Sequence, residues 1–199
     1  MIRMRTYLLH VLLLLYVIIV SAASLWSSKL GSKRQSPVVA NIIKLVSSPS
    51  KNNGNSVEKQ KLIALINQLP KTSVNREAMY GKWNLLYTTE KETNFITKYF
   101  GKCTEVYQQI NKSEINNVIA FEDKVFSVDG MILPNNDDTN RVYFKFTKAS
   151  LTFKNQKPVN LPPFGSGYFE NLYIDDQFRI SFDVRGDYLI SQRVQSIRN

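Results

Sequence analysis

Over most of the chain, hydrophobic and polar residues alternate in short runs, the pattern of β-strands with one buried face. In one run, Val142, Phe144 and Phe146 share a face, and Tyr143 and Lys145 share the other. Turn-forming Asn, Asp and Gly residues separate the runs. Because no helical pattern alternates with these runs, we expect an antiparallel sheet that closes or pairs to cover its edges. The predicted strands are residues 83–89, 104–110, 116–122, 124–130, 141–147, 150–154, 168–175, 178–184 and 187–194.

Two helical patterns precede the strands. The first, in "PVVANIIKLVSS", has apolar residues at helical spacing: Val38, Ile42, Leu45 and Val46. The second, "SVEKQKLIALINQLP", has Ser56 as its expected N-cap and Pro70 at its end. Its apolar stripe, typical of core packing, consists of Leu62, Leu65, Ile66 and Leu69. The sequence therefore predicts a mainly β fold of the α+β class, in which a helical pair precedes the strands.

The first residues have the composition of a targeting leader. "MIRMR" is positively charged, "YLLHVLLLLYVIIV" is apolar but short for a membrane span, and "SAAS" offers small residues for cleavage. The next stretch, "SLWSSKLGSKRQSP", is rich in Ser and basic residues and has no acid, like a transit peptide. This combination resembles the bipartite leader of proteins imported into complex plastids. The alternatives are an uncleaved signal anchor and a secreted protein with a basic linker.

The net charge of +10 belongs mainly to this N-terminal part. Seven of the 26 basic residues precede Glu58, the first of the 16 acidic residues, so the rest of the chain carries about +3. Nucleic-acid-binding domains cluster Lys and Arg on one element, and no such cluster follows Glu58, so we do not expect nucleic-acid binding. Cys103 is the only cysteine, which excludes an intramolecular disulfide.

The segment "YGKWNLLYTT" opens the first predicted strand with a Gly-x-Trp pattern. Gly81 permits an unusual backbone angle or a close approach, and Trp83 is placed to close the floor of a small barrel. This pattern resembles the first strand of lipocalin-like (calycin) barrels, in which a basic residue of the last strand often stacks on the Trp. Arg193 is the candidate for this cation–π contact. A plain core aromatic is the alternative for Trp83.

Taken together, the helical pair, "GKWNLLYTT", "QQIN" and "LPPFGSGYFENLYIDDQFRISFDVRGDYLISQR" resemble the plastid lipid-associated protein family, also called fibrillins or plastoglobulins. The resemblance covers about residues 37–195. The matching positions are Gly81, Lys82, Trp83, Leu85, Leu86, Tyr87, Thr88, Tyr173, Asp175, Arg179, Ile180, Ser181, Gly186 and Arg193. The resulting division is a signal peptide at 1–23, a transit-like linker at 24–36, a helical segment at 37–72 and a lipocalin-like barrel at 78–197.

The resemblance implies a non-enzymatic plastid protein at plastoglobules or thylakoids that binds or organises apolar molecules, such as carotenoids, quinones, fatty acids or galactolipids. It implies no cofactor and no metal. A small barrel has room for one such ligand where side chains do not fill it. The candidate lining residues are Leu85, Tyr87, Val106, Phe126, Phe144, Phe146, Leu151, Phe153 and Tyr188.

A polar anchor for the ligand could be Arg179, or Arg193 if it is not occupied with Trp83. Arg179 follows Asp175 by four residues, so the two could instead form a structural pair. The pattern favours the pair, because a partly buried charge is tolerated chiefly when it is paired.

Two other classes of function stay open. An enzyme acting on lipid or pigment would rely on carboxylates such as Glu170, Asp175 and Asp176, because the only histidine, His10, lies in the leader. A structural or assembly subunit would dock on lipid or on photosynthetic membrane complexes, with "LPPFGSGYF" as an apolar contact loop.

Overall fold

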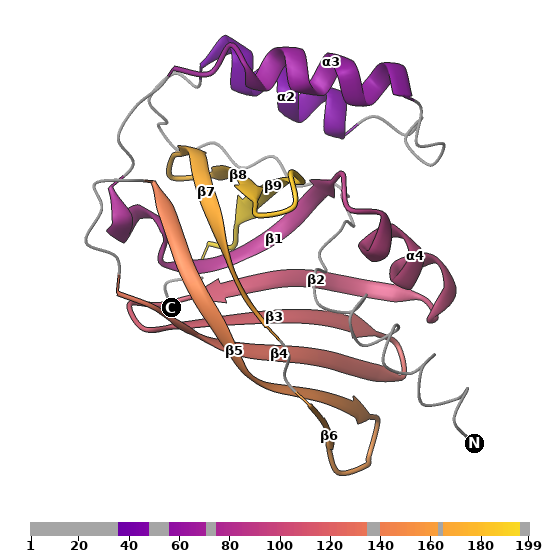
Figure 1. Ribbon diagram of the computed structural model, residues 1–199. Helices are drawn as coiled ribbons and strands as arrows, with labels where there is room; N and C mark the ends of the chain where they lie inside the picture. Colours follow the sequence, from indigo (N-terminus) through magenta and orange to yellow (C-terminus); the bar gives the residue numbers. More distant parts are fainter. Residues whose placement is uncertain (1–35, 48–55, 71–74, 135–139, 163–164, 196–199) are drawn as a thin grey trace. The chain divides into compact units, whose positions relative to one another are not determined.

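The computed structural model describes residues 36–47, 56–70, 75–134, 140–162 and 165–195. They belong to two compact units, a helical pair and a strand-rich unit that begins after residue 72, and each is described by itself (Figure 1). The predicted signal peptide and nearly all of the transit-like linker lie outside the described residues. No helix among the described residues is long and apolar enough to span a membrane.

The helical pair consists of α2 (Pro37–Val46) and α3 (Ser56–Ile66), which lie against each other. Pro37 occupies the first turn of α2, where its missing N–H leaves no hydrogen bond unmade. The buried residues follow helical spacing in both elements, and Pro70 lies beyond the end of the second. They are Val39, Ile42 and Val46 from the first helix, and Leu62, Ile66 and Leu69 from the second and the turn after it.

The strand-rich unit is a nine-stranded antiparallel sheet (Figure 1). Its order is β4-β3-β2-β1-β9-β8-β7-β5-β6, and β4 also pairs with β5. Every strand except β6 therefore has a neighbour on both sides, and these strands close into what we call the strand ring. The strands are β1 (Gly81–Thr88), β2 (Cys103–Ile110), β3 (Glu114–Phe121), β4 (Lys124–Ile132), β5 (Arg141–Phe153), β6 (Val159–Leu161), β7 (Ser166–Ile174), β8 (Phe178–Asp183) and β9 (Tyr188–Arg193).

The positions of most strands agree with the sequence pattern, but β5 corrects it. The predicted strands at 141–147 and 150–154 are one continuous strand, which pairs with β4 from Phe144 to Phe153. The pairing register shifts between Asp129 and Gly130, opposite residues 146–148, so a β-bulge interrupts the alternation of apolar residues there. The interruption resembles a turn in the sequence although the strand continues.

Three short elements were not predicted: the 3₁₀ helix η2 (Arg76–Met79), α4 (Lys91–Tyr99) and β6. α4 connects β1 to β2 (Figure 1). Ile96 is its buried apolar side chain among those the structure describes, while Phe95 and Tyr99 are exposed. A helix that buries so little produces no recognisable hydrophobic period.

The interior of the strand ring contains two hydrophobic clusters. The floor cluster consists of Met79, Trp83, Ile110, Ile115, Val142 and Phe169. The larger cluster, which we call the α4-end cluster because Ile96 belongs to it, consists of Leu85, Ile96, Val106, Ile119, Phe121, Phe126, Val128, Phe146, Ala149 and Leu189. Phe144 packs against both, so the two clusters are continuous through the ring.

The ring closes where the first strand meets the last, at Trp83 opposite Arg193. The Arg193 guanidinium lies 4.1 Å from the centre of the Trp83 ring, a cation–π contact that contributes about 0.5–2 kcal/mol. Arg193 Nη1 donates to the Tyr80 carbonyl at 2.7 Å, and Nη2 donates to that of Ala78. The Trp83 indole N–H donates to the Met79 carbonyl at 2.7 Å. These contacts attach the last strand to the segment that leads into the first.

Gly81 is required by this closure for two separate reasons. Its φ of +131° lies in a region that residues with a side chain rarely adopt. A Cβ at this position would also lie 2.8 Å from Arg193 Nη1. In the Gly-x-Trp pattern, Gly81 thus leaves room for the Arg193 guanidinium, and Trp83 supplies the indole on which that guanidinium stacks.

We predict that Gly81→Ala lowers the free energy of unfolding by about 2–4 kcal/mol, because backbone strain and displacement of the Arg193 guanidinium add. Gly101→Ala is the matched control. Its φ of +125° is similar, but the nearest atom to its Cβ would be the flexible end of Lys124, at 3.4 Å. The control should lose about 1–2 kcal/mol in urea unfolding monitored by circular dichroism. Equal losses in the two variants would show that the Arg193 contact is not constrained by Gly81.

Candidate ligand-binding interior

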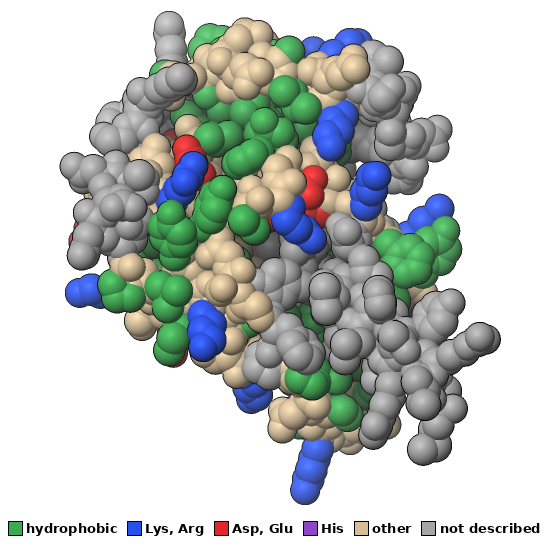
Figure 2. All heavy atoms as spheres, in the orientation of Figure 1, with side chains coloured by type: hydrophobic (Ala, Val, Ile, Leu, Met, Phe, Trp, Pro, Cys, Tyr) green, Lys and Arg blue, Asp and Glu red, His purple; other side chains and the backbone are tan. Residues whose placement is uncertain are grey.

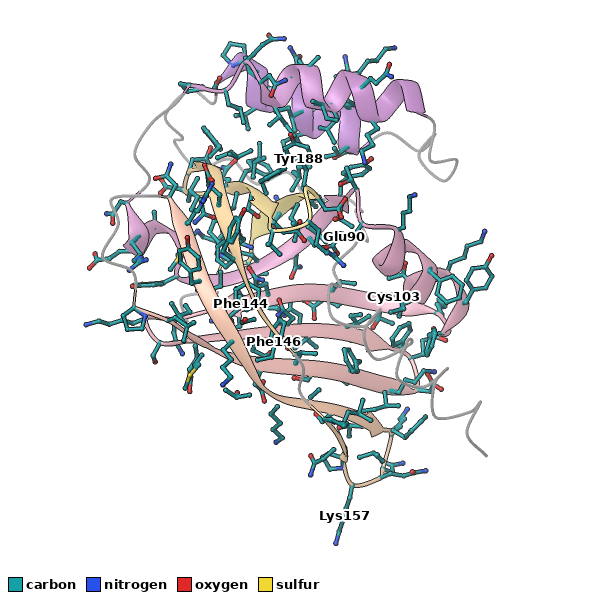
Figure 3. All side chains as sticks on the ribbon, viewed as in Figure 1. Glu90, Cys103, Phe144, Phe146, Lys157 and Tyr188 are labelled. Carbon is teal, nitrogen blue, oxygen red and sulfur yellow. The ribbon has the colours of Figure 1, made fainter. Side chains whose placement is uncertain are left out.

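Most of the predicted lining residues face the interior of the strand ring. Leu85, Val106, Phe126 and Phe146 are buried in the α4-end cluster. Phe144 and Leu151 pack against it, and Phe144 lies beside Phe146 with ring centres 4.9 Å apart (Figure 3). Phe153 alternates with Leu151 on β5 and therefore shares its face.

Two predicted lining residues lie on the opposite face. Tyr87 pairs with Ile190, next to the inward-facing Leu189, because a bulge between Leu85 and Tyr87 reverses the alternation. Tyr188 also precedes Leu189 and contacts Phe182, with ring centres 5.2 Å apart. Its segment, "YLI", is apolar at three successive positions, so alternation could not identify the inner face.

Both interior clusters combine fully buried residues with half-buried apolar neighbours. Trp83 and Ile110, in the floor cluster, are almost completely inaccessible to solvent. Four apolar side chains that pack against the α4-end cluster are only half-buried. They are Cys103, Phe144, Leu151 and Leu161. Beside the floor cluster, Tyr80, Ile132, Phe144 and Ile174 are half-buried as well.

Arg179 lies inside the ring beside the floor cluster and is 1% exposed. Its guanidinium lies 5.4 Å from the centre of the Trp83 ring and 5.3 Å from that of Phe169. Arg179 Nη2 donates to Gln108 Oε1, and Gln108 Nε2 donates to Asn117 Oδ1 at 2.8 Å. Arg179 Nε and Nη1 are buried without a hydrogen-bond partner.

The predicted pair between Arg179 and Asp175 does not form. Asp175 lies in the turn between β7 and β8, where its carboxylate accepts hydrogen bonds from the backbone N–H groups of Gln177 and Phe178 at 2.7 and 2.6 Å. It also accepts one from the Tyr173 hydroxyl at 2.6 Å. Asp175 is thus occupied in stabilising the turn. The described residues supply no carboxylate that forms an ion pair with Arg179.

Burial, and to a smaller extent the positive charge of Arg193, lower the pKa of Arg179 to about 9. The guanidinium therefore stays protonated at neutral pH, as a cation surrounded by apolar rings and one amide. Removing a charge from water without a counter-ion is costly, so this residue does not stabilise the ligand-free fold through its charge.

The carboxylates considered for catalysis do not converge on a reaction centre. Glu170 pairs with Arg141, Nε to Oε2 at 3.0 Å, and Asp176 is exposed. Burial raises the pKa of the Cys103 thiol, which disfavours the reactive thiolate. Within the described part of the chain, no group of three or more His, Cys, Asp or Glu side chains could hold a metal ion.

Sequence reasoning missed the polar partners of the interior. Gln108 lies between Val106 and Ile110 on β2, at the inward positions of a strand, and this spacing was a usable signal. Asn171 is buried with an unpaired Oδ1, and it donates weakly to Met79 Sδ at 4.0 Å. Phe169, which faces Arg179, could have been identified by its alternation on β7.

The face of the molecule in Figure 2 shows Lys and Arg side chains scattered among apolar and neutral ones rather than gathered in one patch. Some lysines of the described residues form ion pairs, as in Lys82–Glu105 at 2.6 Å and Lys102–Glu122 at 2.5 Å.

Comparisons with known proteins agree with the family resemblance that the sequence motifs indicated. The family model described as PAP_fibrillin matches residues 44–192. The chain is 40% identical over 127 residues to the probable plastid-lipid-associated protein 11, chloroplastic, of Arabidopsis thaliana. That match covers 59% of this chain and 57% of the relative. This chain belongs to the PAP_fibrillin family, the plastid lipid-associated proteins. No solved structure matches it significantly.

We predict that Arg179→Met raises the free energy of unfolding at pH 7 by about 1–3 kcal/mol, because it removes an uncompensated buried charge at similar volume. The pKa of Arg179 is lower in the folded chain than in the unfolded one, so the unfolded state binds more protons above pH 9. The advantage of the variant should therefore be full below about pH 9 and shrink as the pH rises toward 12.

Urea unfolding of the ligand-free chain at several pH values tests this, with Lys145→Met as the control. Lys145 is an exposed cation on the outer face of β5, so its replacement should change stability by less than about 0.5 kcal/mol. A loss of stability in Arg179→Met would mean that the contacts with Gln108, Trp83 and Phe169 outweigh the cost of burying the charge.

Proposed function

We propose that this chain is a non-enzymatic plastid lipid-associated protein whose strand ring is a lipocalin-like barrel that holds one apolar molecule. Family membership supports lipid association, and the name of the relative supports a plastid location. The leader read from the sequence agrees with that location. A barrel of roughly eight strands is wide enough for one small ligand.

The observation that carries this proposal is the set of half-buried apolar side chains that pack against the α4-end cluster. Phe144, Leu151 and Leu161 pack against an interior cluster and still keep accessible surface. A ligand that covered this surface would gain about 25 cal/mol for each Å² of apolar area removed from water. The candidate ligands are a carotenoid, a quinone, a fatty acid or a galactolipid, drawn from plastoglobules or thylakoids.

The chemistry of the titratable groups supports binding rather than catalysis. Glu170 and Asp175 are engaged in an ion pair and in a turn, and the Cys103 thiol has a raised pKa. None of these groups faces the apolar surface together with a second group that could exchange a proton with it.

We predict that the full chain, incubated with a thylakoid lipid extract and purified by gel filtration, retains about one apolar molecule per chain. Mass spectrometry of an organic extract identifies and counts it. Phe144→Asp should reduce the bound amount at least about ten-fold, because it places an unpaired carboxylate in the apolar interior. Lys145→Asp introduces the same group on the outer face of the same strand and should leave the bound amount unchanged.

Circular dichroism and thermal unfolding show whether both variants are folded. The absence of any bound species from the unchanged chain, or equal amounts from Phe144→Asp and the unchanged chain, would contradict an internal binding site.

A second candidate function, docking on a membrane surface as a coating or assembly subunit, is favoured by α4. Phe95 and Tyr99 are 48% and 62% exposed, and their ring centres lie 4.8 Å apart. Lys91 and Lys98 on the same helix are also exposed. Exposed aromatic rings beside lysines are typical of helices that lie on anionic membrane surfaces.

We predict that the double variant Phe95→Ser, Tyr99→Ser lowers co-flotation of the chain with liposomes of plastid lipids at least about five-fold. The double variant Val159→Ser, Val184→Ser is its control, because those residues are 51% and 48% exposed and do not belong to α4. Unchanged flotation of the α4 variant would exclude this helix as the membrane contact.

A further inference from the structure

Arg179 is the feature of the interior that the binding of a neutral apolar molecule leaves unexplained. The guanidinium is buried, stays charged at neutral pH, and makes one hydrogen bond, to Gln108. Arg179 Nε and Nη1 carry three of its five N–H donors, and both atoms are buried without an acceptor. Unmet donors on a charged group are among the most costly defects of a protein interior.

The aromatic neighbours of Arg179 do not meet this need. The rings of Trp83 and Phe169 lie 5.4 and 5.3 Å away and interact with the charge through their faces. A ring face offers no lone pair to the N–H groups that lie in the plane of the guanidinium. An acceptor with a negative charge would satisfy both the donors and the uncompensated cation.

The guanidinium is held in place before any ligand arrives. Gln108 Oε1 accepts from Nη2, and the side chain of Gln108 is fixed in turn by its bond to Asn117 at 2.8 Å. A carboxylate therefore meets an oriented cation, and little rotamer freedom is lost on binding. Carboxylates are the planar acceptors that arginine binds best, through two parallel hydrogen bonds.

The surroundings of Arg179 show what else the ligand must contain. Phe144 packs against the floor cluster beside Arg179 and against the α4-end cluster, so apolar surface runs continuously from the cation toward the half-buried residues. A hydrocarbon chain fits that surface, while a short polar acid would leave it uncovered.

We propose that Arg179 binds the carboxylate of a long-chain carboxylic acid whose hydrocarbon chain lies along the apolar interior of the strand ring. This inference rests on the proposed function, and it narrows the ligand from apolar molecules in general to acids. Carotenoids, quinones and galactolipids carry no charge, so they would leave the cation uncompensated.

The test compares oleic acid with oleyl alcohol, which has the same chain and a neutral headgroup. Binding of each to the full chain is measured by titration calorimetry at pH 7.5. The unchanged chain should bind the acid at least about ten-fold more tightly than the alcohol. Arg179→Met should remove this preference, because it weakens the binding of the acid and leaves the binding of the alcohol unchanged. Lys145→Met, which removes one exposed cation, should retain the preference.

A spectroscopic measurement on the unchanged chain makes the test independent of how the variants fold. Oleic acid labelled with ¹³C at its carboxyl carbon reports its own ionisation by NMR as the pH is lowered. When it is bound beside Arg179, the pKa of the acid should fall about 1–3 below that of the free acid.

The possible outcomes distinguish a failure of the Arg179 assignment from a failure of the proposed function. Equal binding of acid and alcohol, with an unshifted carboxyl pKa, would overturn the assignment of Arg179 and leave the apolar-binding function intact. Binding of neither compound would overturn the assignment as well, and it would count against the proposed function itself.

Discussion

The fold depends on the contact between the two ends of the sheet, where Arg193 of β9 covers Trp83 of β1. A sheet of this length would otherwise expose two unpaired edges. The arginine joins them through the indole face and through the carbonyl groups of Ala78 and Tyr80, which precede the first strand. Because these partners lie more than 100 residues from Arg193 along the chain, the contact also fixes the register in which the strands between them must pair.

The same closure explains why two arginines with similar surroundings have different roles. Arg193 is only partly buried and uses both terminal nitrogens on backbone carbonyls, so its charge is well solvated by the protein. Arg179 contacts the same indole from deeper in the ring, and its one hydrogen-bond acceptor is the side-chain amide oxygen of Gln108. Arg193 therefore has hydrogen-bond partners for its charge, whereas Arg179 is a buried cation with unpaired donors.

The sequence allowed most of the strands, the helical pair and the Gly81–Trp83–Arg193 contact to be predicted, because these depend on local alternation and on spacing within a known pattern. It could not reveal the face on which Tyr87 lies, since the bulge after Leu85 arises from pairing with β9. It also favoured the wrong partner for Arg179. Proximity in sequence suggested Asp175, whereas the turn takes that carboxylate and the fold brings Gln108 from another strand.

A buried cation without a counter-ion destabilises a ligand-free protein, and its presence calls for a physical reason. If packing were the only requirement at this position, a residue such as Met would fill the space beside Trp83 and Phe169 without the cost of desolvating the charge. Gln108, held by Asn117, keeps the guanidinium oriented but leaves the charge uncompensated. The two unpaired donor nitrogens of Arg179 therefore lower the stability of the ligand-free chain. This arrangement is expected when the ligand carries the missing acceptor.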